Sequence, residues 1–305
     1  MPLELAVLLK RSTGAKLLVD FRDFWADVGI EKKPFKFVYR HLKRREPNYF
    51  AAADHIVTLT ARAADILMKW YPAAVGGRRD NYTVIPCCAD FDHFDPSRVD
   101  LSAVAEHREA LSLGKGPVLL YLGSIGHDYL LSEMLKLFRE LRALRPDARF
   151  LFVSNNAREE VERQADLEGI PREAIRYVSV DREHVPEYIA LADFSVVFIR
   201  PTLSKAGCSP TKLAELFALN VPVVANTGVG DIDAIVDFDR NGSVVVHDFS
   251  PQTLRSAIER ILALPPARRQ CIRAGSEEFA LSEGIKRYAE IYERLEAPGS
   301  NLRAA

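Results

Sequence analysis

The sequence lacks an apolar run long enough to cross a membrane. A membrane-spanning helix needs about 20 mostly apolar residues, and the longest such run near the start, residues 5–9, is only a few residues long. The pattern of a secretory signal is also missing from the first residues. These absences argue against an integral membrane protein and lead us to expect a soluble, cytoplasmic one.

Cysteine is scarce, at four residues in 305, and no two of the four form a Cys-x-x-Cys pair. The adjacent Cys87 and Cys88 could form a disulfide only with strain. We therefore expect four reduced thiols, as in a cytosolic protein. Seven histidines are scattered without the spacing of a metal site, which argues against a structural zinc.

Neither positive nor negative residues are in large excess over the whole chain, because the net charge is -1. The balance hides an asymmetry: residues 1–79 carry 15 lysines and arginines against 8 acidic residues, and the remainder carries 26 against 34. The acidic remainder opposes a long polyanion, so we expect no nucleic-acid partner. With 48% hydrophobic and 27% charged residues, the composition is globular and the chain is long enough for two domains.

Short β-rich runs alternate with longer amphipathic stretches, a pattern typical of βα units and parallel sheets. A first group of strands is expected at residues 16–20, 55–58 and 82–85. A second group is expected at residues 118–122, 149–153, 175–178, 194–199, 221–225 and 243–246. Helices between these strands are expected at residues 130–144, 158–168, 185–191 and 210–219. The short strand-to-helix steps predict an α/β fold whose second sheet is doubly wound.

This pattern divides the chain into three parts. Residues 1–97 are expected to form a first domain, residues 98–281 a second domain, and residues 282–305 a closing helix and tail. The apolar residues at helical spacing in the closing helix are Ile285, Tyr288, Ile291, Tyr292 and Leu295. We expect this stripe to cross back and pack on the first domain.

Residues 200–233 hold the densest candidate site. They leave a buried strand, make a loop and enter a helix, with Ser209 expected as N-cap, Pro210 at the first helical position and Thr211 next. The unpaired N–H groups of a helix start attract an anion such as a diphosphate. The cations expected around this point are Arg200, Lys205 and Lys212.

Glu215 follows Lys212 by three residues, so the two side chains share one face of the helix. A carboxylate at this place could accept two hydrogen bonds from a ribose diol while the lysine meets the phosphates. The alternative is an ordinary ion pair between the two side chains on the helix surface.

Five stretches, in their order and spacing, resemble the family 4-type retaining glycosyltransferases, which have the GT-B fold of two Rossmann-like domains. The stretches are ADHIVTLT, YTVIPCCADFDHF, PVLLYLGSIGHDY, SPTKLAELFALNVPVVANTGVGD and SEGIKRYAEIYERL. The resemblance covers most of the chain. It implies transfer of a sugar from a nucleoside-diphosphate sugar to a hydroxyl acceptor with retention of configuration, in cell-surface glycan or glycolipid synthesis.

The resemblance also implies roles for single residues. Gly123 and Ser124 would lie against the donor phosphates, where small residues let the backbone approach the ligand, and Val180 belongs to the loop that packs on the base. The further donor-binding residues that we expect are Arg200, Lys205, Ser209, Pro210, Thr211, Lys212 and Glu215. We expect a donor of UDP or GDP type, no metal and no cofactor, because cations stabilise the leaving diphosphate. Lys212 is then also catalytic.

Two departures from the family pattern fall near the donor site. Gly207 stands where the first of two family glutamates would contact the donor sugar. His127 and Asp128 stand where the family commonly has an arginine and a lysine after the glycine loop. Neutralisation of the phosphates is therefore expected to depend more on Lys205 and Lys212.

Residues 20–25 leave the first strand at its carboxyl end, the place that faces the acceptor in the resembling family. Asp23 and Arg22 are the catalytic candidates there, because a carboxylate or arginine could orient the acceptor hydroxyl or stabilise developing charge. The alternative is that the two side chains form an ion pair at the domain edge.

Only about three strands are expected before the second domain, whereas a GT-B first domain ordinarily has six or seven. The first domain is therefore expected to be incomplete, lacking its opening βαβ units. Donor binding could survive that loss. A catalytically inactive sugar-nucleotide-binding or partner subunit remains the alternative to an enzyme.

The stretch KKPFKFVYRHLKRR, residues 32–45, mixes cations with apolar side chains. Its cations are Lys32, Lys33, Lys36, Arg40, Lys43, Arg44 and Arg45, and its apolar residues include Phe35, Phe37, Val38, Tyr39 and Leu42. Such a mixture suits a peripheral helix on the anionic inner face of a membrane, and it favours a glycan or lipid-linked acceptor. The alternative is a solvated helix whose aromatic rings pack on its own domain.

Overall fold

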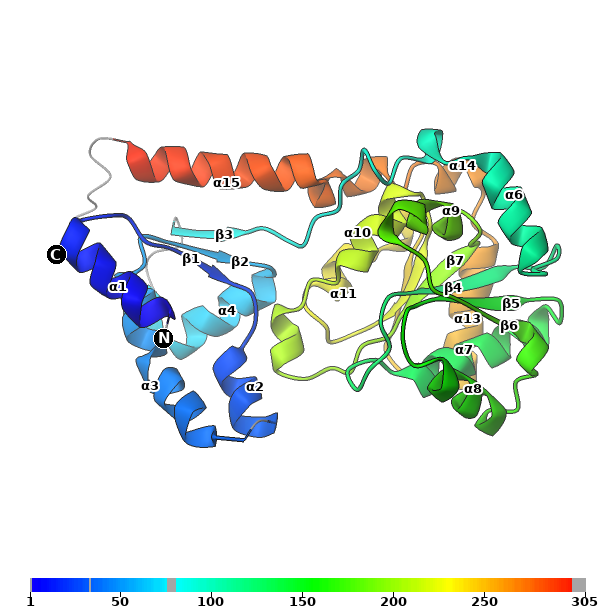
Figure 1. Cartoon of the computed structure of the whole chain (residues 1–305), viewed down its shortest axis with the longest axis horizontal. Helices are drawn as coiled ribbons and strands as arrows, with labels where there is room; N and C mark the ends of the chain where they lie inside the picture. Colours follow the sequence, from blue (N-terminus) through cyan, green and yellow to red (C-terminus); the bar gives the residue numbers. More distant parts are fainter. Residues whose placement is uncertain (1, 33, 76–80, 298–305) are drawn as a thin grey trace.

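A computed structural model of the chain describes residues 2–32, 34–75 and 81–297. In Figure 1 two β-sheets with their helices lie side by side, the first at the left and the second at the right. All the strand pairs in both sheets are parallel. The α/β fold expected from the alternating pattern is thus confirmed.

The first sheet has three strands in the order β1-β2-β3. Its strands are β1 (Leu18–Phe21), β2 (His55–Thr58) and β3 (Tyr82–Val84). Its helices are α1 (Pro2–Thr13), α2 (Trp25–Lys32), α3 (Lys36–Ala52), α4 (Ala61–Trp70) and α5 (Pro72–Val75). Phe24 and Phe50 belong to the hydrophobic core of this half, and the surrounding elements bury both side chains almost completely.

The second sheet has six strands in the order β6-β5-β4-β7-β8-β9. Its strands are β4 (Val118–Leu122), β5 (Arg149–Val153), β6 (Ile175–Val178), β7 (Phe194–Val197), β8 (Val223–Asn226) and β9 (Val244–Val246). Relabelled from its own first strand this is the order 3-2-1-4-5-6 of a Rossmann fold. The order reverses between β4 and β7, which is the point where such a sheet binds its ligand.

Helices cover both faces of the second sheet, as a buried parallel sheet requires. They are α6 (Leu101–Ala110), α7 (Leu131–Leu144), α8 (Arg158–Leu167), α9 (Val185–Ile189), α10 (Thr211–Ala218), α11 (Ile232–Ile235), α12 (Phe238–Asn241), α13 (Pro251–Leu262) and α14 (Pro266–Arg269). Short 3₁₀ turns are η2 (Pro96–Arg98), η3 (Arg172–Ala174), η4 (Arg182–His184), η5 (Ser204–Gly207) and η6 (Ala274–Phe279).

Strand β4 shows how the sequence produces this layering. Successive side chains of a strand point to opposite faces. Leu119 and Tyr121 accordingly join one core with Phe138 of α7, and Leu120 joins the other core with Phe217 of α10. All five residues of the strand are buried, which explains why an unbroken apolar run marks it.

Five of the nine described strands have bounds that differ from those expected. Strand β1 covers residues 18–21 instead of 16–20, β3 ends at Val84 instead of residue 85, and β9 begins at Val244 instead of residue 243. The other two differences concern β7 and β8. Strand β7 ends at Val197 rather than at residue 199, and β8 begins at Val223 rather than at residue 221. Pro222 has no N–H to give to a ladder, so it contributes only its carbonyl, which accepts from the N–H of Ser195 at 2.9 Å.

The closing helix α15 (Leu281–Glu296) crosses back over the first sheet, as expected (Figure 1). Ile291 packs with Val57 and Ile85, and Tyr288 and Leu295 lie against the same cluster. The expectation for Ile285 and Tyr292 was wrong, because they are 60% and 54% exposed. The helix is rotated about its axis relative to the expected orientation. Its buried face begins at Gly284, where a Cβ would come within 2.8 Å of Cys88 Sγ.

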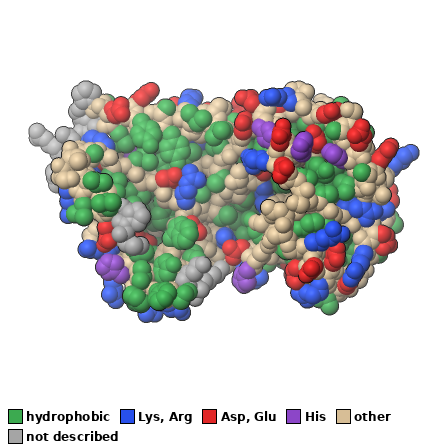
Figure 2. Space-filling model, viewed as in Figure 1, with side chains coloured by type: hydrophobic (Ala, Val, Ile, Leu, Met, Phe, Trp, Pro, Cys, Tyr) green, Lys and Arg blue, Asp and Glu red, His purple; other side chains and the backbone are tan. Residues whose placement is uncertain are grey.

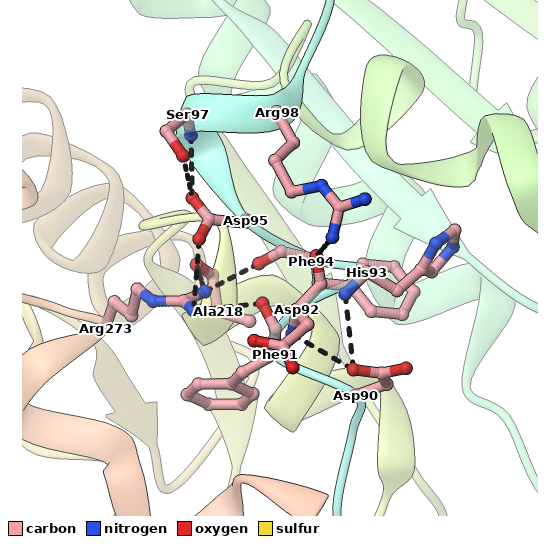
Figure 3. Close-up of polar contacts among 10 residues, drawn as sticks. All are labelled: Asp90, Phe91, Asp92, His93, Phe94, Asp95, Ser97, Arg98, Ala218 and Arg273. Atoms are coloured by element: carbon pink, nitrogen blue, oxygen red, sulfur yellow. Dashed lines mark hydrogen bonds and ion pairs between the residues drawn. The ribbon is translucent and has the colours of Figure 1, made fainter.

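Arg273 fixes the segment that connects β3 to α6 (Figure 3). Its guanidinium donates to the carbonyl oxygens of Phe94 at 2.7 Å, Phe91 at 2.9 Å and Ala218 at 3.0 Å, and lies 3.7 Å from the carboxylate of Asp95. One half-buried cation therefore ties the connecting segment to the end of α10.

The start of helix α4 also joins the two halves. The carboxylate of Asp231 accepts from the N–H groups of Ala61 at 2.6 Å and Arg62 at 3.1 Å. The hydroxyl of Thr60 donates to the carbonyl of Ala206 at 2.7 Å. Because a helix start is the positive end of the helix dipole, Asp231 stabilises α4 while it holds the second half in place.

His55 links the closing helix to β2 and makes stability depend on pH. Its Nδ1 accepts from Arg294 Nη2 at 2.9 Å, and its Nε2 lies 2.9 Å from Thr83 Oγ1. Burial, aided by the positive charge of Arg294, lowers the pKa of His55 to about 4. We predict that the free energy of unfolding falls as the pH drops from about 6.5 towards 4, because the unfolded state takes up the proton first.

Chemical denaturation at pH 7 and pH 5 checks this prediction with His55→Gln, which keeps hydrogen-bonding capacity but does not titrate. The variant is expected to lose less stability between the two pH values than the wild type. An identical loss in both proteins would show that His55 is not the titrating group.

Candidate functional site

A pocket of about 600 Å³ opens at the carboxyl ends of β4 and β7, the reversal point of the second sheet. It contains seven of the expected donor-binding residues, namely Gly123, Ser124, Val180, Pro210, Thr211, Lys212 and Glu215. Further lining residues that the sequence analysis did not select include Tyr129, Asn155, Asp181, Arg182 and Cys208. Residues from four separate loops thus converge where the topology predicts a ligand.

Lys212 lies in the first turn of α10 with its ammonium buried in the floor of the pocket. Nζ stands 4.5 Å from the ring centre of Tyr121 and 4.4 Å from that of Tyr129. Among the residues that the structure describes, it has no hydrogen-bond partner. Burial lowers the pKa of Lys212 to about 8, although the charges of Glu215 and Cys208 act in the opposite direction.

Gly123 makes room for this ammonium. Its φ of +107° is a conformation that side-chain-bearing residues rarely adopt, and a Cβ there would lie 3.2 Å from Lys212 Nζ. The loop is held by Asn156, whose amide accepts from the N–H of Ile125 at 2.9 Å and donates to its carbonyl at 2.8 Å. Sequence reasoning missed Asn156, because nothing local marks an asparagine as the clamp of a distant loop.

Helix α10 begins one residue later than expected. Pro210 is its N-cap and offers no side-chain hydrogen bond. The N-cap expected at Ser209 is wrong, because its hydroxyl instead accepts from the N–H of Cys87 at 3.0 Å, in the connecting segment. With no side chain capping them, the first N–H groups of α10 keep their capacity to bind an anion.

Glu215 is 7% exposed and does not pair with Lys212. Its Oε1 accepts from Arg182 Nη1 at 3.0 Å, across the pocket from loop to helix. The alternative of a surface ion pair with Lys212 is therefore wrong. Sequence reasoning missed Arg182, since its partner lies 33 residues away along the chain.

The other two expected cations lie outside the pocket lining. Lys205 Nζ pairs with the carboxylate of Asp128 at 2.9 Å. Burial disfavours its charge, but the hydrogen bond and charge of Asp128 outweigh this and raise the pKa of Lys205. Arg200 is exposed, and its Nε lies 3.4 Å from the carbonyl of His127. Of the three expected cations, only Lys212 thus lies in the pocket. Contacts of Arg200, Lys205 and Ser209 with a donor remain predictions.

The first half meets the donor loop at Gly207. A Cβ on Gly207 would lie 3.4 Å from the Phe24 ring and 3.7 Å from Asp23 Cα. Phe24 thus packs where a longer side chain would begin, which gives a physical reason for glycine at this position. The charge of Asp23 also contributes to the raised pKa of Lys205, so Asp23 lies near the loop of the second half that carries Lys205.

The ion pair between Arg22 and Asp23, the alternative to a catalytic role, is not the one observed. Arg22 Nε donates to Asp20 Oδ2 at 2.9 Å, and Tyr288 of the closing helix donates to the same oxygen at 3.1 Å. Asp23 Oδ1 accepts from the N–H of Phe24 at 2.7 Å. Arg22 is therefore tied to the first sheet and the closing helix.

The sequence model of the family "Glycosyl transferases group 1" matches residues 104–278, which is more than half of the chain. The chain belongs to this family. It is a glycosyltransferase, as the resemblance implied. No curated protein sequence matches it.

Solved structures confirm the GT-B fold. HepE of Anabaena, in complex with UDP and glucose, is 15% identical with a TM-score of 0.68, over 95% of this chain and 75% of that one. Sucrose-phosphate synthase of Thermosynechococcus elongatus is 18% identical with a TM-score of 0.67, over 96% and 71%. WaaG, a glycosyltransferase of lipopolysaccharide biosynthesis, is 17% identical with a TM-score of 0.64, over 93% and 79%.

The buried ammonium predicts a pH-dependent affinity for diphosphates. Lys212→Ala is expected to weaken binding of a nucleoside diphosphate by about 1.5–3 kcal/mol and of the nucleoside much less, because the ammonium meets phosphate. Wild-type affinity for the diphosphate should fall as the pH rises through about 8, where Lys212 loses its proton. Isothermal titration measures both effects.

Lys136→Ala is the matched control, because Lys136 only pairs with Glu133 one turn away on α7. It should leave both affinities unchanged. Equal losses of nucleoside and nucleoside diphosphate in Lys212→Ala would assign Lys212 a structural role instead.

Proposed function

We propose that this glycosyltransferase transfers a sugar from a nucleoside-diphosphate sugar, of UDP or GDP type, to a hydroxyl acceptor with retention of configuration. The observation that carries the proposal is the unpaired ammonium of Lys212 beneath the glycine loop. A buried cation without a partner costs stability, and a bound diphosphate would supply its missing partner. In this assignment residues 1–97 form the acceptor side and residues 98–281 the donor side.

The donor is oriented by the order of groups along the pocket. The diphosphate lies between the backbone of Gly123 and Ser124, the start of α10 and Lys212. The ribose diol meets the carboxylate of Glu215, and the base lies against the loop of Val180. The structures of HepE with UDP and with UDP-glucose support a uridine donor, since that protein shares the fold.

The transfer step uses the leaving diphosphate itself. As the bond between the sugar and the diphosphate breaks, negative charge grows on the phosphate oxygen, and Lys212 and the N–H groups of α10 stabilise it. That oxygen takes the proton of the acceptor hydroxyl, and the acceptor oxygen bonds to the anomeric carbon on the face from which the diphosphate leaves, which gives retention. Asp23, near Gly207 and Lys205, orients the acceptor, and its neighbour in sequence Arg22 supports it. We propose that no metal and no cofactor takes part.

Glu215→Gln tests the ribose contact. The variant is expected to weaken binding of UDP or GDP by about tenfold, as for one charge-assisted hydrogen bond, and to leave 2′,3′-dideoxy analogues unaffected. Equal losses for both ligands in isothermal titration would remove Glu215 from the ribose site. Ser243, a buried hydroxyl of the same sheet with partners at Val223 and Asn241, gives the control Ser243→Ala, which should affect both ligands alike.

Release of free nucleoside diphosphate separates an enzyme from an inactive subunit. With a panel of UDP- and GDP-sugars, the wild type is expected to release UDP or GDP faster when a lipid-linked or soluble glycan acceptor is added. Tight binding of one nucleotide class without any release would support the inactive, sugar-nucleotide-binding subunit.

We also propose that the surface around the start of α3 contacts an anionic membrane. Phe35 and Phe37 are 70% and 69% exposed, so their rings point to solvent rather than into their own domain. Arg40, Arg44 and Arg45 are exposed on the same helix. Figure 2 shows hydrophobic and basic side chains together at the lower left, over α2 and α3. The described helices include none long and apolar enough to cross a bilayer.

Some residues of the stretch 32–45 do not belong to the surface that is proposed to contact the membrane. Lys43 points inward, where its Nζ lies 2.7 Å from Asp27 and 3.9 Å from the ring centre of Trp70. Val38, Tyr39 and Leu42 are half-buried. Lys33 and the side chain of Lys32 lie outside the described part of the chain. The remaining rings and cations favour a lipid-linked acceptor, and the role of the similar WaaG in lipopolysaccharide biosynthesis agrees with it.

Vesicle sedimentation tests the membrane contact. The wild type is expected to bind anionic vesicles at low salt and to detach at high salt, since each cation contributes about 1 kcal/mol near such a surface. Phe35→Ser with Phe37→Ser should bind less at both salt concentrations. Leu167→Ser, at a residue 70% exposed on α8, is the control. Equal wild-type binding to neutral vesicles would contradict the electrostatic part of this proposal.

A further inference from the structure

The ion pair of Arg182 and Glu215 joins two walls of the donor pocket. Arg182 opens η4, on the loop after β6, and Glu215 belongs to α10, the helix that carries Lys212. The carboxylate is 7% exposed, whereas two thirds of the arginine side chain is open to solvent. An exposed side chain thus neutralises a buried one.

Glu215 pairs with Arg182 and not with Lys212, and the missing pair is also informative. Opposite charges three residues apart on a helix usually attract each other, and Lys212 is in that position. The structure instead places Lys212 between the rings of Tyr121 and Tyr129, with no hydrogen bond to any described residue. Two opposite charges on one helix turn are held apart.

The connecting segment holds Arg182 in place. The backbone carbonyl of Arg182 lies 3.1 Å from His93 Nε2, and its guanidinium lies 5.4 Å from the ring centre of Phe94. Figure 3 shows His93 and Phe94 side by side on this segment, with Arg273 bound to the Phe94 carbonyl. The position of Arg182 is therefore fixed from outside the helix that bears Lys212 and Glu215.

We propose that Arg182 is a positioning residue that keeps the Glu215 carboxylate off the Lys212 ammonium. The ammonium then remains available for a diphosphate and the carboxylate for a ribose diol. The identity of those ligands rests on the proposed function, whereas the separation of the two charges does not. A carboxylate has about four lone-pair sites, so the single hydrogen bond from Arg182 leaves sites for the ribose hydroxyls.

Titration of Lys212 without any nucleotide tests the separation directly. The groups that face its ammonium are Tyr121, Tyr129, Cys208, Glu215 and the backbone of Gly123. In wild type, NMR of labelled lysine side chains should give Lys212 a pKa near 8, assigned with Lys212→Met. In Arg182→Met the freed carboxylate pairs with Lys212 and should raise this pKa by about one unit or more.

Two further variants separate pairing from the mere loss of a positive charge. In the double variant with Arg182→Met and Glu215→Gln no carboxylate is left to pair, so the rise in pKa should vanish. Arg163→Met, which removes an exposed arginine from an ion pair with Glu160 on α8, should leave the pKa of Lys212 unchanged. An unchanged pKa in Arg182→Met, or a rise that persists in the double variant, would overturn the proposal.

Binding shows the consequence for the donor. Arg182→Met is expected to lower affinity for UDP by at least about tenfold, because both contacts are then compromised, and Arg182→Lys should restore part of it. Unchanged or higher affinity in Arg182→Met would contradict the positioning role. If the wild type binds neither UDP nor GDP, the proposed function fails, and the nucleotide-free titration still decides the role of Arg182.

Discussion

The ammonium of Lys212 is held inside the protein without a hydrogen-bond partner among the described residues, and the proposed donor site is organised around it. Taking such a charge out of water costs stability unless other groups offset the loss. The faces of Tyr121 and Tyr129 provide part of that offset through cation–π attraction. Gly123 leaves the space above the ammonium open. Glu215, the nearest acid on the same helix, is held by Arg182 instead.

The two halves meet through polar contacts and through the packing of an aromatic ring. Asp231 binds the start of α4, Thr60 binds the carbonyl of Ala206, and Phe24 packs on Gly207. On the other side of the pocket, Arg273 fixes the connecting segment that touches Arg182. The loops around the pocket thus contact both halves, although every residue that lines the pocket comes from the second half.

The sequence predicted the fold well where burial alone decides structure. The strands at residues 118–122 and 149–153 match the structure at both ends, because largely apolar runs between turn residues leave little alternative. The half-buried strand at residues 175–178 also matches at both ends. The closing helix was predicted to cross back, but its buried face was misjudged at Ile285 and Tyr292. Helical spacing defines a stripe, and contacts with residues distant in the sequence, among them Cys88 beside Gly284, set its rotation.

The candidate site was predicted in part. The pocket contains seven of the ten expected donor-binding residues, since motif residues follow the strand ends that a Rossmann sheet brings together. Ser209, Lys205 and Glu215 have partners that the local sequence cannot reveal, namely Cys87, Asp128 and Arg182. Each of these contacts joins residues far apart in the chain. Local sequence propensity therefore predicted a helix start, but it did not predict the partners of the side chains around it.

A crystal structure of the chain with bound UDP tests the central claim most directly, because it shows which group receives the diphosphate. We expect a diphosphate oxygen within hydrogen-bonding distance of Lys212 Nζ, beside the backbone of Gly123, and ribose hydroxyls that donate to the carboxylate of Glu215. A diphosphate bound at Arg200 or Lys205, with Lys212 still unpaired between its two tyrosines, would contradict it.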